Sequence, residues 1–169
     1  DFCLSRGLGD VYKRQANSLL DYQVLLELNK LEKKLQETFG EREIISPLSL
    51  VKALNQAQNQ GNRAAFALPS QGQYLRMRRF LKQAVSTAGE NLVSPDQKSG
   101  RISTRVQDLG SLEMGERRNE VLGYVNKEIN PDLLQVRWTG TAYLIDRSHE
   151  SVTRPVSYTH LRAHETGRN

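Results

Sequence analysis

The chain has 169 residues, of which 37% are hydrophobic, and a formal net charge of +5 at pH 7. This composition is ordinary for a globular domain, and it excludes low-complexity and disulfide-rich classes because there is no biased tract and only one cysteine. No apolar run approaches the roughly 20 residues that cross a bilayer as a helix.

Both ends of the chain resemble translated sequencing adaptor. The adaptor of transposase-based library preparation encodes SRGLGDVYKRQ in one orientation, which matches residues 5–15, and its reverse complement encodes VSYTHLRAHET, which matches residues 156–166. Natural termini would reproduce one oligonucleotide in both orientations only by coincidence, over eleven residues each. We therefore assign residues 1–15 and 155–169 to adaptor, counting Pro155 because adaptor bases account for most of its codon. We expect these ends to be disordered.

Removing the ends changes what the composition says. The domain is then residues 16–154, without Cys3 and with His149 as its one histidine, so a cysteine nucleophile and a histidine-based metal cluster are excluded. The ends hold five Lys/Arg and three Asp/Glu, which leaves 19 against 16 and a net charge of +3. A net positive charge this small does not indicate nucleic-acid binding. We expect an open-ended fragment of a longer protein, so the lack of a signal peptide or a membrane span says nothing about location.

Residues 21–39 predict a helix. Apolar side chains recur there at spacings of three and four, and Gly40 offers a left-handed cap after them. The stripe consists of Val24, Leu28, Leu31, Leu35 and Phe39. The pattern is too short for a heptad coiled coil, so we expect a helix that lies on a sheet.

A short strand and a second helix follow. Residues 43–45 are the strand candidate. Ser46 is placed to cap the helix, and Pro47 is placed to occupy its first position. The polar run at residues 55–62 is expected to be the solvated end of this helix.

Residues 71–88 predict a third helix after a loop at residues 66–70. Its expected apolar contacts are Tyr74, Leu75, Phe80, Leu81, Ala84 and Val85, and its basic side holds Arg76, Arg78, Arg79 and Lys82. The basic side has two interpretations: a patch for phosphate, nucleic acid or anionic lipid, or a solvated face whose stems cover apolar surface. Base rates for surface charge favour the second. No Gly-rich phosphate loop or interleaved aromatic residue supports the first.

The last part of the chain predicts a strand, a helix and a second strand. Leu92-Val93 and a turn at residues 94–100 lead by a hairpin into an alternating strand at residues 101–107. Gly110-Ser111 then offers a turn and an N-cap, and Asn130-Pro131 ends the helix. The apolar positions of the helix are Met114, Val121, Leu122, Val125 and Ile129, and those of the second strand are Leu134, Val136 and Trp138.

Two strands joined by one helix of this length make a βαβ unit with parallel strands and a right-handed crossover. The earlier helices must bury their apolar stripes against the same sheet. The predicted fold class is therefore α+β, with helices packed on one side of a small mixed sheet.

No catalytic motif is present. The chain has no Gly-x-Ser-x-Gly elbow, no HExxH, no P-loop and no dinucleotide fingerprint. Asp146, His149 and Glu150 share one helix face by their spacing, but such a trio is commonplace on exposed helices. The sequence therefore predicts no enzyme, no catalytic residue, no cofactor and no metal site.

Four segments, taken in order, resemble one family. They are ISPLSLVKALNQAQNQGN, FALPSQGQYLRMRRFL, RISTRVQDLGS and TGTAYLIDRSHESVTR. With the helix before them, they make residues 16–154 resemble the large extracytoplasmic loop of resistance-nodulation-division (RND) exporters, in the branch called MMPL. The specific feature is their order: a leucine-rich helix, a Ser-Pro start, a Leu-Pro, a turn with Asp, an Arg-Ile strand, and then a strand with Thr-Gly.

The resemblance implies a membrane exporter of two similar halves, each with a porter domain of βαβ-type subdomains. Such exporters move hydrophobic or amphipathic molecules outward, coupled to proton entry through ionisable residues of transmembrane helices that this chain does not contain. It also implies an inner-membrane protein with this segment on the periplasmic side, joined to the remaining halves of the same transporter or to further copies, with no nucleic acid and no cofactor. Thr139, Gly140 and Thr141 would form the turn before the next membrane helix.

Two other interpretations stay open. One is a free-standing α+β binding or interaction module whose contact surface is the basic third helix. The other, less favoured, is an enzyme that uses Asp146, His149 and Glu150.

Overall fold

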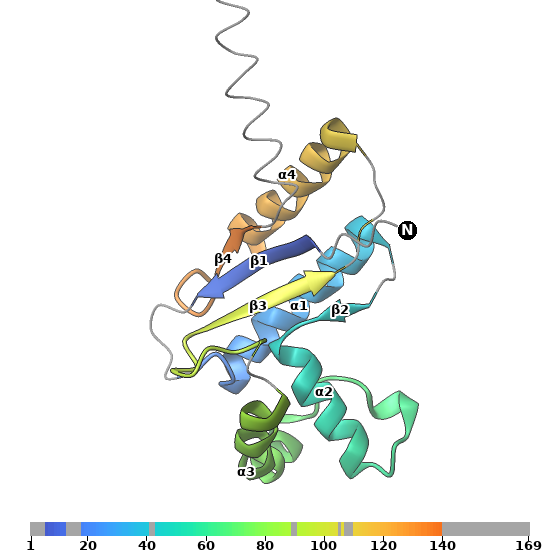
Figure 1. The fold of residues 1–169 in the computed structure, drawn as a ribbon, viewed down its shortest axis with the longest axis vertical. Coiled ribbons are helices and arrows are strands. Elements are labelled where there is room, and N and C mark those ends of the chain that lie inside the picture. The colour runs from blue at the N-terminus through green and yellow to red at the C-terminus, as the bar shows by residue number, and fades with distance from the viewer. Residues whose placement is uncertain are drawn as a thin grey trace, which may run out of the picture.

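The computed structural model describes residues 6–12, 18–40, 43–88, 91–104, 106 and 110–139. Its helices and strands (Figure 1) are, in chain order, β1 (Arg6–Tyr12), α1 (Tyr22–Phe39), β2 (Ile44–Ile45), α2 (Pro47–Gln58), the 3-10 helix η1 (Arg63–Ala65), α3 (Gln71–Ala88), β3 (Ser99–Thr104), α4 (Gly110–Glu128) and β4 (Gln135–Trp138). None of the described helices is long and apolar enough to cross a membrane.

The four strands form one sheet in the order β2-β3-β1-β4, and each neighbouring pair is antiparallel. It follows that β3 and β4 run in the same direction with β1 between them, and that β1 and β2 run in the same direction with β3 between them. Helix α4 joins the first of these pairs, and α1 joins the second. This is the arrangement of two split βαβ units in a ferredoxin-like fold, with α2, η1 and α3 inserted between β2 and β3.

The predicted α+β class is confirmed, and so is the common direction of the two strands that flank the last helix. The expectation of a mixed sheet is wrong for the described strands. The reason is that β1 lies between β3 and β4 and pairs antiparallel with both of them.

Strand β1 lies inside the sheet although its sequence resembles adaptor. Its residue Val11 pairs with Gly100 of β3 on one side and with Val136 of β4 on the other. The expectation that residues 1–15 are disordered is therefore wrong for Arg6–Tyr12. A central strand is held through backbone N–H and C=O groups, which almost any sequence supplies. The adaptor origin of these residues is a statement about coding DNA, and it stays a prediction.

Helix α1 is the centre of the core. Its predicted stripe is buried, with no member more than 6% exposed: Val24, Leu28, Leu31, Leu35 and Phe39. Helices α1 and α4 contact each other and lie across one face of the sheet (Figure 1), so the stripe is enclosed between these elements. After α1, Gly40 takes a positive φ of 89° as predicted, although its ψ of 165° lies outside the left-handed helical region.

Helix α2 begins with the predicted cap. The Oγ atom of Ser46 accepts hydrogen bonds from the backbone N–H groups of Leu48 and Ser49. In return, the backbone N–H of Ser46 donates to the hydroxyl of Ser49 at 3.1 Å, which completes a capping box. Pro47 occupies the first helical position, where its missing N–H costs no hydrogen bond.

The polar end of α2 is only partly solvated. The run at residues 55–62 is exposed for most of its length, as predicted, but Asn55 is only 6% exposed. Its side-chain amide donates to the carbonyls of Ala65 and Ala67, at 2.9 and 3.2 Å. Asn55 therefore fastens the loop after α2 to the helix, which the polar composition alone did not predict.

The chain before β3 forms the predicted hairpin. Val93 bridges Gly100, and the N–H of Arg101 donates to the carbonyl of Leu92 at 3.0 Å. A side chain at Gly100 would be crowded, because a Cβ atom there would lie 2.5 Å from Leu19 and 2.8 Å from the Leu92 carbonyl oxygen. Glycine is therefore required where the hairpin meets the segment before α1.

Helix α4 begins earlier than predicted. Ser111, the expected N-cap, lies within the first turn, because Gly110 already starts the helix. Gly110 has a φ of +73°, so it takes up the change of chain direction itself. The predicted stop is confirmed: α4 ends at Glu128, and the backbone N–H of Asn130 donates to the buried Glu27 carboxylate of α1 at 3.1 Å.

Candidate functional site

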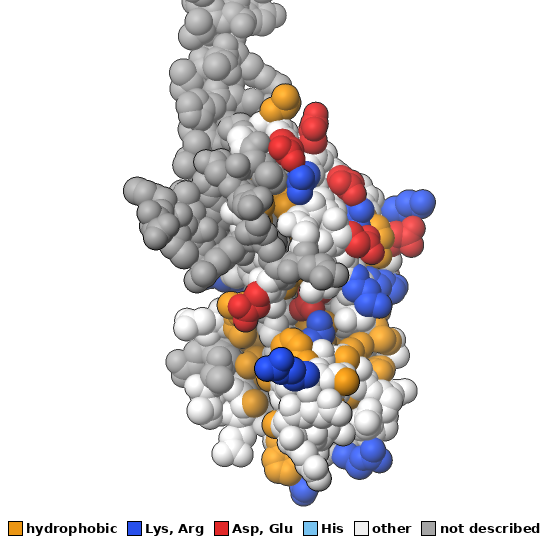
Figure 2. Space-filling view, turned by 90° about the vertical axis from the view of Figure 1, so that its right-hand side faces the viewer, with side chains coloured by type: hydrophobic (Ala, Val, Ile, Leu, Met, Phe, Trp, Pro, Cys, Tyr) orange, Lys and Arg blue, Asp and Glu red, His pale blue; other side chains and the backbone are white. Residues whose placement is uncertain are grey.

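The inserted helices carry an unbalanced charge. Residues 44–88 contain six Lys/Arg and no Asp or Glu. Lys52 pairs with Glu32 of α1. The other five cations are exposed and form no ion pair within the described part of the chain: Arg63, Arg76, Arg78, Arg79 and Lys82. At the lower end of the molecule, which α2 and α3 form (Figure 1), Figure 2 shows Lys and Arg side chains beside hydrophobic ones and no acidic side chain.

Helix α3 turns a mixed basic and apolar surface to solvent. We call it the α3 surface, and it consists of Leu75, Arg76, Arg78, Arg79, Phe80 and Lys82. Leu75 is 61% exposed and Phe80 is 41% exposed, so the prediction that both are core contacts is wrong. Helix α3 packs through a narrow stripe instead, which includes Met77 at 0% exposed and Leu81 at 2%. Leu75 and Phe80 therefore do not belong to the core cluster of the described residues.

Spacing brings the apolar and basic members of the α3 surface together. Leu75 and Arg79 are four residues apart, and so are Arg76 and Phe80, which places each pair on neighbouring turns of one helix face. The guanidinium carbon of Arg79 lies 4.6 Å from the centre of the Phe80 ring. This cation–π contact holds the ring beside the charge and covers one of its faces.

An open hollow lies between α3 and the hairpin before β3. Its volume is about 550 Å³, and its lining consists of Lys82, Val85, Ser86, Asn91, Val93, Ser94, Pro95 and Gln97. The lining is half polar and carries one charge, which belongs to Lys82. The lining includes Lys82 and Ser86, but the hydroxyl of Ser86 donates to the backbone carbonyl of Gln83 at 2.9 Å and not to the Lys82 side chain.

Tyr74 anchors α3 to the segment before α1. The residue is 4% exposed, and its hydroxyl donates to the carbonyl of Leu20. Its ring lies 5.4 Å from that of Tyr22, measured between ring centres. Burial raises the pKa of the Tyr74 hydroxyl above its usual value, because the phenolate would lose its hydration.

Because the pKa of Tyr74 is raised, the folded state becomes less stable at alkaline pH. Unfolded tyrosine ionises near pH 10, whereas folded Tyr74 keeps its proton to higher pH. The stabilisation is therefore complete below the unfolded pKa and is lost as pH rises toward the folded one. Tyr74→Phe should remove this component of the decline, at a cost of about 1 kcal/mol for the unpaired Leu20 carbonyl. Urea unfolding between neutral and alkaline pH measures both. Tyr124→Phe on α4 is the control, and an unchanged decline in Tyr74→Phe would contradict the assignment.

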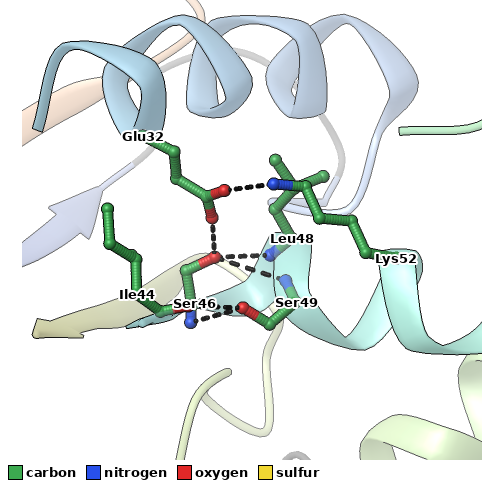
Figure 3. A network of polar contacts seen from close by, with 6 residues as sticks. All are labelled: Glu32, Ile44, Ser46, Leu48, Ser49 and Lys52. Carbon is green, nitrogen blue, oxygen red and sulfur yellow. Dashed lines mark hydrogen bonds and ion pairs between the residues drawn. The ribbon is translucent and has the colours of Figure 1, made fainter. Parts of the chain in front are cut away.

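A buried polar cluster joins α1 to the start of α2 (Figure 3). The Glu32 carboxylate is at its centre, in a side chain whose residue is 2% exposed. One oxygen accepts the hydroxyl proton of Ser46, and the other accepts from the ammonium of Lys52 at 2.6 Å. Both oxygens of a buried carboxylate are thus satisfied, and the charge has a counter-ion.

The cluster contains the residue types of a serine–lysine active site, but solvent and substrate cannot reach its serine. Ser46 is 0% exposed, so its hydroxyl does not meet solvent or substrate. Its proton is held by Glu32, and its oxygen already accepts the two backbone N–H groups of the helix cap. A nucleophile needs a base that takes its proton at an accessible oxygen. The role of the cluster is therefore structural.

Glu32 and Lys52 were not singled out from the sequence, although a signal was present. Glu32 follows Leu28 by four residues and precedes Leu35 by three, which places a carboxylate on the buried stripe of α1. Such a position calls for a cation from another element. The sequence alone contains many candidate lysines, and only the packing of α2 against α1 selects Lys52.

The other sequence-predicted residues are not brought together in the described structure. Asp146, His149 and Glu150 lie outside the described residues, as do Gly140 and Thr141, while Thr139 follows β4 and is half-buried. Across the parts of the chain that are described, no three His, Cys, Asp or Glu residues form a group able to hold a metal ion. Comparison with protein-family models, with curated proteins and with solved structures finds no match.

Proposed function

We propose that residues 16–154 form an extracytoplasmic, porter-like domain of an RND-type exporter of the MMPL branch. The observation that carries the proposal is the order of the sequence motifs that resemble this family. Supporting it, β3, α4 and β4 form a split βαβ unit with β1 between its two strands, and βαβ-type subdomains are what the resemblance implies.

In this proposal the domain contributes part of the efflux path for hydrophobic or amphipathic molecules. Proton coupling belongs to transmembrane helices outside this chain, and the domain works beside the remaining halves of the same transporter in the inner membrane, on its periplasmic side. The role of the domain is mechanical: its subdomains tilt and open or close a path. The turn at Thr139, Gly140 and Thr141 would lead toward the next membrane helix.

Sequencing the uninterrupted gene tests the proposal. The codons after Arg154 should encode an apolar run of roughly 20 residues, the length that crosses a bilayer as a helix. A stop codon or a polar continuation at that point would remove the proposal and favour a free-standing module.

The sequence of the same gene before Ala16 gives a second test, at the N-terminal end of the domain. If residues 1–15 come from adaptor, the natural codons before Ala16 should encode a strand of about the length of β1, because the place between β3 and β4 lies within the sheet. Apolar and polar residues should alternate in it. A natural helix or a Pro-rich stretch at this position would contradict the expected topology.

A further inference from the structure

We infer that the α3 surface docks on an anionic lipid bilayer. The surface is Leu75, Arg76, Arg78, Arg79, Phe80 and Lys82, all exposed on one helix. The proposed partner is a membrane surface. Its anionic headgroups complement the cations of the α3 surface, and its acyl chains complement the exposed apolar side chains.

The charge argument rests on segregation. The excess of the whole domain is small, but residues 44–88 hold six cations and no acid. The four cations of the α3 surface have no ion-pair partner among described residues, so docking breaks no internal ion pair. Each Lys or Arg near an anionic bilayer strengthens binding about fivefold, and this attraction falls off within a Debye length.

The apolar argument rests on Leu75 and Phe80. Both are large and exposed, and each lies four residues from a cation on the same helix: Leu75 from Arg79, and Phe80 from Arg76. At a bilayer surface such side chains enter the boundary between headgroups and acyl chains, while arginines remain at the headgroups.

Nucleic acid fits the same charges less well. Binding of single strands uses open aromatic faces on which bases stack. Phe80 is the one aromatic side chain of the α3 surface, and the guanidinium of Arg79 covers one of its faces. No aromatic platform of several rings accompanies it, so the exposed apolar residues favour lipid.

The inference goes beyond the exporter proposal, because it concerns another surface and holds for a free-standing domain too. Co-sedimentation of the 169-residue chain with vesicles tests it. Vesicles of phosphatidylcholine with about one third phosphatidylglycerol should bind the chain, and vesicles of phosphatidylcholine alone should bind it far less. Raised ionic strength should weaken the binding.

Substitutions on α3 locate the contact. The double variant Arg76→Gln, Arg79→Gln should bind the anionic vesicles about thirty-fold less, since two cations are lost. Leu75→Ser should bind about tenfold less, because a large apolar side chain no longer enters the bilayer. Each variant stays in the full chain, so any contribution of the charged ends cancels in the comparison.

Matched controls lie on the other helices. Lys33→Gln with Lys127→Gln removes two exposed cations from α1 and α4, and Leu112→Ser removes a leucine that is 80% exposed on α4. Both controls should leave vesicle binding unchanged. Equal losses in the controls and the α3 variants would overturn the inference. Equal binding to neutral vesicles, or tighter binding to a single-stranded oligonucleotide than to anionic vesicles, would overturn it as well.

Discussion

Replacing Glu32 with alanine is expected to lower the free energy of unfolding by about 3–5 kcal/mol. The substitution leaves the ammonium of Lys52, whose side chain is 15% exposed, without its counter-ion. It also leaves the hydroxyl of the fully buried Ser46 without an acceptor. A buried charge or hydrogen-bond donor that has lost its partner destabilises the fold by its full desolvation free energy. This loss is larger than the net stabilisation that the intact pair contributes. Urea unfolding followed by circular dichroism measures the loss.

The chain supplies a control in a second ion pair of α1. The side chain of Lys34 of α1 is 17% exposed, nearly as buried as that of Lys52, but its partner Glu120 of α4 is 54% exposed, so water reaches this pair and Glu120→Ala should cost much less than Glu32→Ala. A double variant, Glu32→Leu with Lys52→Met, should recover most of the loss, because an apolar pair needs no counter-ion. If Glu32→Ala cost no more than Glu120→Ala, the cluster would not be the buried junction that the structure shows.

The features that the sequence predicted correctly are set by residues close in the chain. Ser46 and Pro47 mark the start of α2 because a cap and a first helical position are neighbours, and Ser49 completes the box three residues on. The stripe of α1 is a repeat along one helix. In each case the physical cause lies within a turn or two, so a single sequence contains it.

The features that the sequence missed depend on packing between distant segments. Leu75 and Phe80 fit a helical stripe as well as Met77 does, and only the position of α2 decides which side of α3 is buried. The contact between Glu32 and Lys52 is a similar case, because it exists only once α1 and α2 meet. The cations of the α3 surface were visible in the sequence as a charge pattern. Its apolar residues could be assigned to it only once the structure gave the exposure of each side chain.

The centre of the sheet was missed for a third reason. Pairing of β1 with β3 and β4 uses backbone groups, so side-chain patterns carry little information about it. An adaptor-like sequence and a natural strand offer the same N–H and C=O groups. The topology of two split βαβ units, and not the sequence of residues 6–12, therefore defines that place in the sheet.

Val11→Pro should consequently disrupt the sheet, with a cost on the order of 3 kcal/mol. Val11 lies between Gly100 of β3 and Val136 of β4, and proline removes the one N–H that this residue can donate to a neighbouring strand. Because β4 pairs with β1 alone among the described strands, the backbone amides of Gln135–Trp138 should lose protection first. Hydrogen exchange resolved by residue measures this.

Val11→Thr is the matched control, since threonine keeps both the N–H and a strand-forming side chain. It should leave the exchange of β4 unchanged. Amides of β4 that stay protected in Val11→Pro would mean that β4 is held by α4 and not by β1. Fast exchange of the same amides in the parent chain would mean that residues 6–12 do not hold the sheet in solution. Replacing them with the natural strand encoded before Ala16 should then restore protection, because that outcome would mean that the backbone groups of β1 alone are not enough to hold the sheet.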